Sequence, residues 1–167
     1  TKSDGKFYCY DYLWEECDAE IEGEFLDEYV CSSDKWNKCS VDALGPLSGA
    51  DEYFCDGTSW NTCEKNDEDD LIDEDKYICK SEKWKRCSGS TEEPSTNNKY
   101  ACLKDKWQTC TPELGAEEKL INKDNNVCYN SLWNLCDKDN LGIITPSFQY
   151  HCAGAKNNKN VYLWKDE

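Results

Sequence analysis

The cysteines are the residues with which this chain could do chemistry. The sequence has 13 Cys among 167 residues, and twelve of them form Cys-x7-Cys pairs. Zinc sites usually combine Cys-x2-4-Cys knuckles with His, but every pair here is wider and the only His is His151. The spacing therefore predicts disulfides, which form in an oxidising compartment.

Catalytic chemistry finds little support in the sequence. A single His, His151, supplies no Ser-His-Asp or Cys-His set that could be assembled. It is adjacent to Cys152, but neighbouring residues of a strand point to opposite faces. Nothing among the 35 acidic residues singles out a carboxylate pair for glycoside hydrolysis. We predict that the chain is not an enzyme and has no cofactor.

The segment 64–75 is the one dense group of possible metal ligands. It holds eight carboxylates in twelve residues. Because calcium takes six to eight oxygen ligands, weak candidates for a cation site are Asp67, Asp69, Asp70, Asp73 and Asp75. The favoured interpretation is a solvated loop held open by repulsion between like charges, so no metal site is predicted with it.

The cysteine pairs belong to a tandem repeat, Tyr-x-Cys-x4-Trp-x2-Cys. Its cores lie at about 7–17, 29–39, 53–63, 77–87, 100–110 and 126–136, with Phe7 and Asn126 in place of Tyr. An atypical terminal copy at 150–164 has eleven residues between Cys152 and Trp164, and its second Cys position is Glu167. Such a period predicts one serial array over residues 1–167.

This repeat resembles the Cys-rich Tyr-x-Cys-x4-Trp-x2-Cys tandem repeats of secreted surface proteins of prokaryotes, archaea in particular. The resemblance covers nearly the whole chain, through the cores given above. It implies an extracellular, disulfide-stapled surface or filament protein. It implies no catalytic residue.

Each core predicts a small β-hairpin, so the expected fold class is all-β. Tyr and Cys lie on one face of the first strand because side chains alternate with period two. Four turn-forming residues such as Ser32–Lys35 then lead to a return strand, which sets the first Cys opposite Trp. Leu, Ile, Val and Phe supply only 26 of the 167 residues. We therefore predict that Tyr and Trp form each hairpin's miniature core rather than sugar-stacking platforms.

Two disulfide registers fit the spacing. The first, within repeats, joins Cys9–Cys17, Cys31–Cys39, Cys55–Cys63, Cys79–Cys87, Cys102–Cys110 and Cys128–Cys136, and leaves Cys152 as the odd cysteine. The second, between repeats, runs from Cys17–Cys31 to Cys136–Cys152 and leaves Cys9. Loop closure gives about 2.6 against about 3 kcal/mol, which does not decide. Constant spacing favours the first register, although a simple four-residue turn disfavours it.

The charge and length of the chain bound its partners and location. A net charge of −16 argues against nucleic acid and anionic membrane surfaces as partners. No run approaches the roughly 18 apolar residues of a membrane helix. With no Met and no apolar leader, we expect a mature chain, extracellular or at the cell surface after signal-peptide removal.

We predict a structural subunit of an extracellular filament, pilus or sheath that assembles with identical subunits. An apolar edge strand near the chain's end could pair with another chain. The predicted assembly residues are Val161, Tyr162, Leu163 and Trp164, packing near the first hairpin of a neighbour. The alternative, compatible with this contact, is that they fold back on residues 150–152 as an ordinary hairpin. The alternative is a secreted adhesin or carbohydrate-binding module that uses exposed Tyr and Trp, with glycans as partners.

Overall fold

The structure is a computed structural model that describes residues 5–88, 94–116, 118, 120–121, 125–155 and 158–166, with only the backbone for 116, 121, 155 and 158–161. Its described residues form short strands in small antiparallel sheets of two or three strands, one short α-helix and one 3-10 turn. The predicted all-β array of disulfide-stapled hairpins is confirmed. No helix among the described segments is long and apolar enough to cross a membrane.

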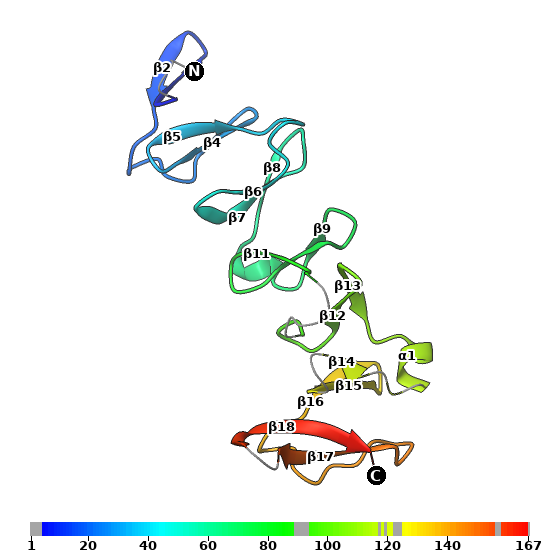
Figure 1. Ribbon diagram of the computed structural model, residues 1–167. Helices are drawn as coiled ribbons and strands as arrows, with labels where there is room; N and C mark the ends of the chain where they lie inside the picture. Colours follow the sequence, from blue (N-terminus) through cyan, green and yellow to red (C-terminus); the bar gives the residue numbers. More distant parts are fainter. Residues whose placement is uncertain are drawn as a thin grey trace. The chain divides into compact units, whose positions relative to one another are not determined.

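The chain divides into two compact units. Figure 1 labels strands of both units. Unit 1 comprises Thr1–Asp67 and Ser81–Trp84. Its sheets are β1 (Phe7–Tyr10) with β2 (Leu13–Glu16); β3 (Phe25–Leu26), β4 (Tyr29–Ser32) and β5 (Lys35–Lys38); and β6 (Gly45–Leu47), β7 (Ala50–Cys55) and β8 (Trp60–Thr62). The 3-10 turn η1 (Lys65–Asp67) follows β8.

Unit 2 comprises Glu68–Lys80 and Lys85–Glu167. The remaining sheets are β9 (Leu71–Ile72), β10 (Tyr77–Cys79) and β11 (Trp84–Arg86); β12 (Tyr100–Leu103) and β13 (Lys106–Thr109); β14 (Leu120–Ile121), β15 (Asn126–Tyr129) and β16 (Leu132–Leu135); and β17 (Tyr150–Ala155) and β18 (Asn158–Asp166). Of these strands, β11 begins in unit 1, at Trp84. The helix α1 (Pro112–Ala116) lies between β13 and β14.

The hairpins place the first Cys opposite Trp, as predicted. Cys31 pairs with Trp36, and the neighbouring pair Ser32 with Lys35 also belongs to the strands. The turn is therefore only Ser33–Asp34, with φ of 56° and 60°. Two consecutive left-handed residues make a type I′ turn, whose twist matches that of the strands. Sequence reasoning expected four turn residues, and the third and fourth hairpins keep that length between their strands, from Cys55 to Trp60 and from Cys79 to Trp84.

The hydrophobic core lies between successive hairpins, which corrects the expectation of a separate core within each one. In β15, Val127 and Cys128 are both fully buried although they point to opposite faces. Cys128 packs with Cys110 of the preceding hairpin, whereas Val127 packs with Trp164 of the following one. A hairpin in the array thus has two buried faces, one for each neighbour.

Candidate functional site

The described disulfides join successive hairpins. The described bridges are Cys17–Cys31, Cys39–Cys55, Cys87–Cys102, Cys110–Cys128 and Cys136–Cys152, with Cα–Cα distances of 5.2–5.5 Å. Cys63 and Cys79 are disulfide-bonded as well. Cys9 is free and exposed. These bridges make the contact between neighbouring repeats, here called the junction, the chemical centre of the molecule.

The favoured pairing within repeats is therefore wrong, and the odd cysteine is Cys9 rather than Cys152. The short turn explains why. Cys9 lies opposite Trp14, and Cys17 is three residues further along, where its N–H donates to the Lys6 carbonyl at 2.8 Å. Three residues of strand span about 10 Å, whereas bridged Cα atoms lie within about 7 Å.

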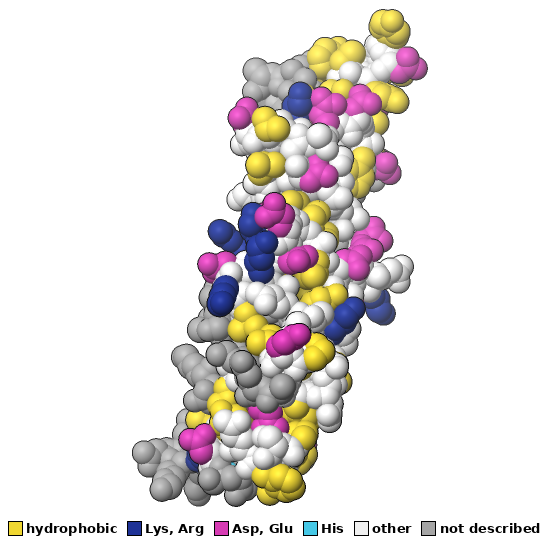
Figure 2. Space-filling view, turned by 90° about the vertical axis from the view of Figure 1, so that its right-hand side faces the viewer, with side chains coloured by type: hydrophobic (Ala, Val, Ile, Leu, Met, Phe, Trp, Pro, Cys, Tyr) yellow, Lys and Arg dark blue, Asp and Glu magenta, His cyan; other side chains and the backbone are white. Residues whose placement is uncertain are grey.

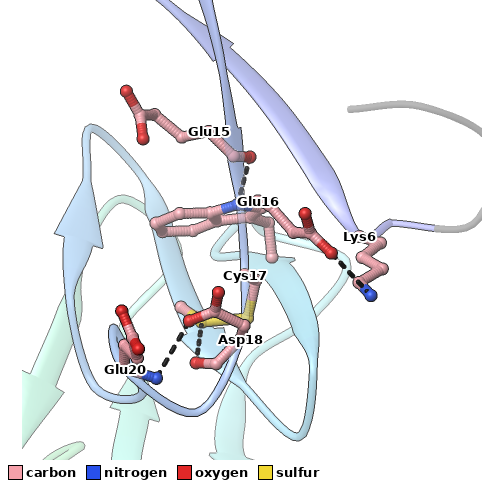
Figure 3. A network of polar contacts seen from close by, with 8 residues as sticks. Lys6, Glu15, Glu16, Cys17, Asp18 and Glu20 are labelled. Atoms are coloured by element: carbon pink, nitrogen blue, oxygen red, sulfur yellow. Dashed lines mark hydrogen bonds and ion pairs between the residues drawn. A yellow bond between two sulfur atoms is a disulfide. The ribbon is translucent and has the colours of Figure 1, made fainter.

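The tryptophans tie the junctions together through one repeated hydrogen bond. In each case the indole N–H donates to the backbone carbonyl of the residue that follows the preceding Trp. The pairs are Trp36 to Glu15 (3.1 Å), Trp60 to Asn37 (2.9 Å), Trp84 to Asn61 (3.3 Å), Trp107 to Lys85 (3.2 Å), Trp133 to Gln108 (3.3 Å) and Trp164 to Asn134 (3.1 Å). Figure 3 shows the Glu15 carbonyl in this bond, beside the disulfide of Cys17. Each buried indole donor is thereby satisfied by the neighbouring hairpin.

A second bond fixes the same register through the backbone. The N–H of Trp36 donates to the Gly5 carbonyl at 2.8 Å, and that of Trp107 to Asp75 at 2.7 Å. Trp133 does the same to Asn98 at 2.9 Å. The three acceptors stand two residues before the first strand's aromatic position or its equivalent, and all have a left-handed backbone, with φ of 75°, 67° and 60°.

The first junction also contains a half-buried tyrosine, Tyr8. The Tyr8 ring packs against those of Tyr29 and Trp36, with centroids 4.4 and 6.1 Å away. Its hydroxyl donates to the Asp27 carboxylate at 3.0 Å. Burial, together with this hydrogen bond, raises the pKa of Tyr8 to about 12. Tyr8 therefore stabilises the junction as a neutral donor.

Sequence reasoning missed two sets of residues that build the junction. The residue between the aromatic position and the first Cys is buried in five hairpins: Val30, Phe54, Ile78, Ala101 and Val127. The residue after Trp braces its own turn, since the Asn134 amide donates to the carbonyls of Tyr129 and Leu132 at 3.0 and 2.9 Å. The sequence contained a signal for both sets: the residues of the first set are all apolar, and those of the second are often Asn or Gln.

The calcium candidates do not come together as a metal site. Among the described residues, the one group of three or more His, Cys, Asp or Glu within reach of a single ion is Cys17, Glu22 and Cys31, and its two sulfurs are bonded to each other. Asp67 accepts the Glu64 N–H at 2.9 Å, and Asp69 is buried and accepts the Thr96 N–H at 3.2 Å.

The other acidic candidates take part in local contacts. Asp73 forms an ion pair with Lys76 at 3.4 Å. The backbone carbonyls of Asp70 and Asp75 accept the N–H groups of Cys79 and Trp107 at 2.9 and 2.7 Å. Within the described part of the chain, these aspartates thus shape the connector and a junction.

The predicted assembly strand folds back on its own chain. Cys152 pairs with Trp164 in the β17–β18 hairpin. Trp164 is buried and donates to the Asn134 carbonyl, so it cannot reach a neighbouring subunit, which corrects the prediction for this residue. Tyr162 and Leu163 are half-buried, and the Val161 side chain lies outside the described residues.

Exposed apolar side chains gather instead at the first hairpin. Tyr12 and Leu13 are 96% and 65% exposed, and Trp14 is 53% exposed, whereas the junction tryptophans are buried or half-buried. Figure 2 shows acidic side chains spread between hydrophobic ones over the visible face. No protein-family model, curated protein or solved structure matches the chain. The geometry of the junctions and of the first and last hairpins thus carries the functional inference.

Proposed function

We propose that the chain is a non-catalytic structural subunit of an extracellular filament or sheath, built by association of identical copies. Disulfide-rich hairpin repeats fit a stabilised extracellular protein. One observation carries the proposal. Among the residues whose side chains the structure describes, 13 large hydrophobic ones are exposed. Eight of these lie in the first repeat or in the last repeat and its connector: Tyr10, Tyr12, Leu13, Trp14, Leu141, Ile143, Ile144 and Phe148.

Self-association has to overcome the repulsion between acidic copies. Each chain carries a net charge of −16. A contact between subunits therefore needs apolar burial, which contributes about 25 cal/mol per Å² of apolar surface. Salt shortens the range of the repulsion, with a Debye length of about 10 Å at 0.1 M. Assembly should accordingly become stronger as the salt concentration rises.

Sedimentation velocity and negative-stain microscopy of the intact, oxidised chain test the proposal. We expect filaments or concentration-dependent oligomers, more abundant at high salt. Leu13→Lys should weaken them, because it places a charge on the exposed apolar face. Val41→Thr with Leu44→Thr is the matched control, since it removes comparable exposed apolar surface from a connector. A chain that stays monomeric at every concentration and salt level would refute the proposal.

A carbohydrate-binding role is the second candidate, favoured by the exposed aromatic group of the first hairpin. Tyr10, Tyr12 and Trp14 all lie within one short hairpin and are exposed. Aromatic rings pair a large apolar face with a polar edge. A glycan array probed with the intact chain separates the two functions. Binding that Tyr12→Asn abolishes, by chains that do not associate, would favour the adhesin.

A further inference from the structure

We infer that the first hairpin of one copy docks on the last hairpin of another in the register of the internal junctions. This inference rests on the proposed function and names the contact that builds the assembly. The occupant of the exposed first hairpin is thus a second copy of this chain. The reason is continuity: the same face of later hairpins is covered by the preceding hairpin, with one disulfide and the same indole bond.

Two sequence positions meet at two internal junctions, between the first and second hairpins and between the fourth and fifth. One is the residue before Trp, and the other lies two or three residues before the first strand's aromatic position. Lys35 lies beside Gly5, where an added Cβ would be 3.9 Å from the Lys35 Cβ and Cγ. Lys106 Nζ lies 3.7 Å from Glu74 Oε2. Where these contacts are described, the position before Trp holds a lysine.

The corresponding positions in the first and last hairpins are both apolar. Leu13 precedes Trp14 and is 65% exposed. Phe148 stands two residues before Tyr150 and is 74% exposed. Its φ of 61° matches the left-handed acceptors at Gly5, Asp75 and Asn98, although such a backbone is unusual for an aromatic residue. The two hairpins therefore match each other better than either matches a lysine-bearing junction.

The remaining parts of the junction have counterparts in the same register. Trp14 would lie over the carbonyls of Phe148 and Lys165, as Trp133 lies over those of Asn98 and Gln108. His151 takes the place of the apolar residue between the aromatic position and Cys. The second Cys position, three residues after Trp164, is Glu167. Cys9 would meet no sulfur there, so the joint between copies is non-covalent.

Replacing the two apolar residues with oppositely charged ones tests the contact. Leu13→Lys and Phe148→Asp each recreate a residue type found at internal junctions. We expect either change to weaken association about tenfold or more, because the burial of one large apolar side chain is lost. The double variant should regain most of that loss through a Lys–Asp pair. If the two losses of association strength simply add in the double variant, the proposed contact is wrong.

A covalent trap tests the register. Glu167→Cys completes the repeat, and bridged cysteines at internal junctions have Cα atoms 5.2–5.5 Å apart. With glutathione disulfide as oxidant, the Cys9 thiolate attacks one sulfur and releases a glutathione thiolate. The introduced thiolate of the neighbouring copy then attacks the Cys9 sulfur of this mixed disulfide and releases the second glutathione. Non-reducing gels should show a ladder.

The outcomes separate the joint from the proposed function. The natural chain and the Glu167→Cys, Cys9→Ser double variant should give no ladder, and adding Leu13→Lys should suppress it. Filaments that give no ladder, or that trap only as dimers, would overturn this joint and keep the structural role. Absence of any association, in microscopy and on gels, would overturn both.

Discussion

At Asn126, the sixth hairpin buries a side-chain amide that makes no hydrogen bond. Neither of its polar atoms has a partner within the described structure, and the residue is fully buried. An unsatisfied buried polar group costs about 1–3 kcal/mol. We therefore expect Asn126→Leu to stabilise this hairpin, seen as slower hydrogen exchange of the β15 amides.

Asn134 is the matched control in the same hairpin. Its amide donates to two turn carbonyls, so Asn134→Leu should speed exchange by removing both bonds. The opposite signs follow from hydrogen bonding and not from residue type. Equal effects at the two positions would contradict this account.

Glu118 gives the last repeat's connector a pH dependence. Burial alone would raise the pKa of its carboxyl, but hydrogen bonds donated by Ser147 and Thr145 lower the pKa below its ordinary value. A lowered folded-state pKa adds stability above the unfolded value, about 4.3, and this stability is lost as the pH falls through the folded pKa. Protection of the Ser147 amide, measured against its intrinsic exchange rate at each pH, should therefore fall below about pH 4.

Glu118→Gln removes the charge and tests this directly. The Ser147 amide of the variant should be less protected at neutral pH, and its protection should change much less on acidification. The Thr145 hydroxyl and Ser147 N–H would still find a neutral acceptor, so the fold should persist. If the loss of protection at Ser147 in acid is the same in the variant, the transition belongs to a titrating group other than Glu118.

At the scale of the element, the hairpin turn carries backbone strain. Lys104 and Asp105 have φ of 51° and 62° in the β12–β13 turn, where Asn-Gly is the preferred pair. A left-handed residue other than Gly, Asn or Asp, such as Lys104, costs about 1–2 kcal/mol. Lys104→Asn with Asp105→Gly should stabilise this hairpin by about that amount, measured by exchange of the Gln108 amide. Lys106→Gly, inside the strand, should destabilise it instead.

The hairpins and their Cys–Trp pairing could be predicted, whereas the bridges could not. Period-two alternation and constant spacing suffice to place Cys31 opposite Trp36. The disulfide partner depends on whether the turn has two residues or four, and Ser33–Asp34 gives no Gly to mark a tight turn. The loop entropies differ by only about 0.4 kcal/mol, so chain statistics could not replace that information.

The candidate contact between copies was predictable only in part. Sequence reasoning predicted association through Val161, Tyr162, Leu163 and Trp164, but Trp164 is buried in the junction with the preceding hairpin. Phe148 has no repeat-pattern signal of its own. Its importance follows from its exposure and left-handed backbone, which appear only once the hairpins are positioned.

At the scale of the whole molecule, hairpins that contact only their neighbours predict that damage to one junction stays local. Removing the bridge between the fifth and sixth hairpins with Cys110→Ala and Cys128→Ala opens a loop of sequence separation 18. The expected cost is about 3 kcal/mol, and contacts limited to neighbours should confine it to those hairpins. Hydrogen exchange should then change in β13 and β15 but not in β4. Uniform loss of protection from the first hairpin to the last would indicate a single shared core.

The disulfide map of the native chain is the most direct test, because every junction depends on it. Alkylation of free thiols, followed by non-reducing proteolysis and mass spectrometry, reads the bridges individually. We predict Cys17–Cys31 and Cys136–Cys152 as linked peptides, with the alkyl label on Cys9 alone. A peptide linking Cys9 to Cys17, with the label on Cys152, would contradict the account.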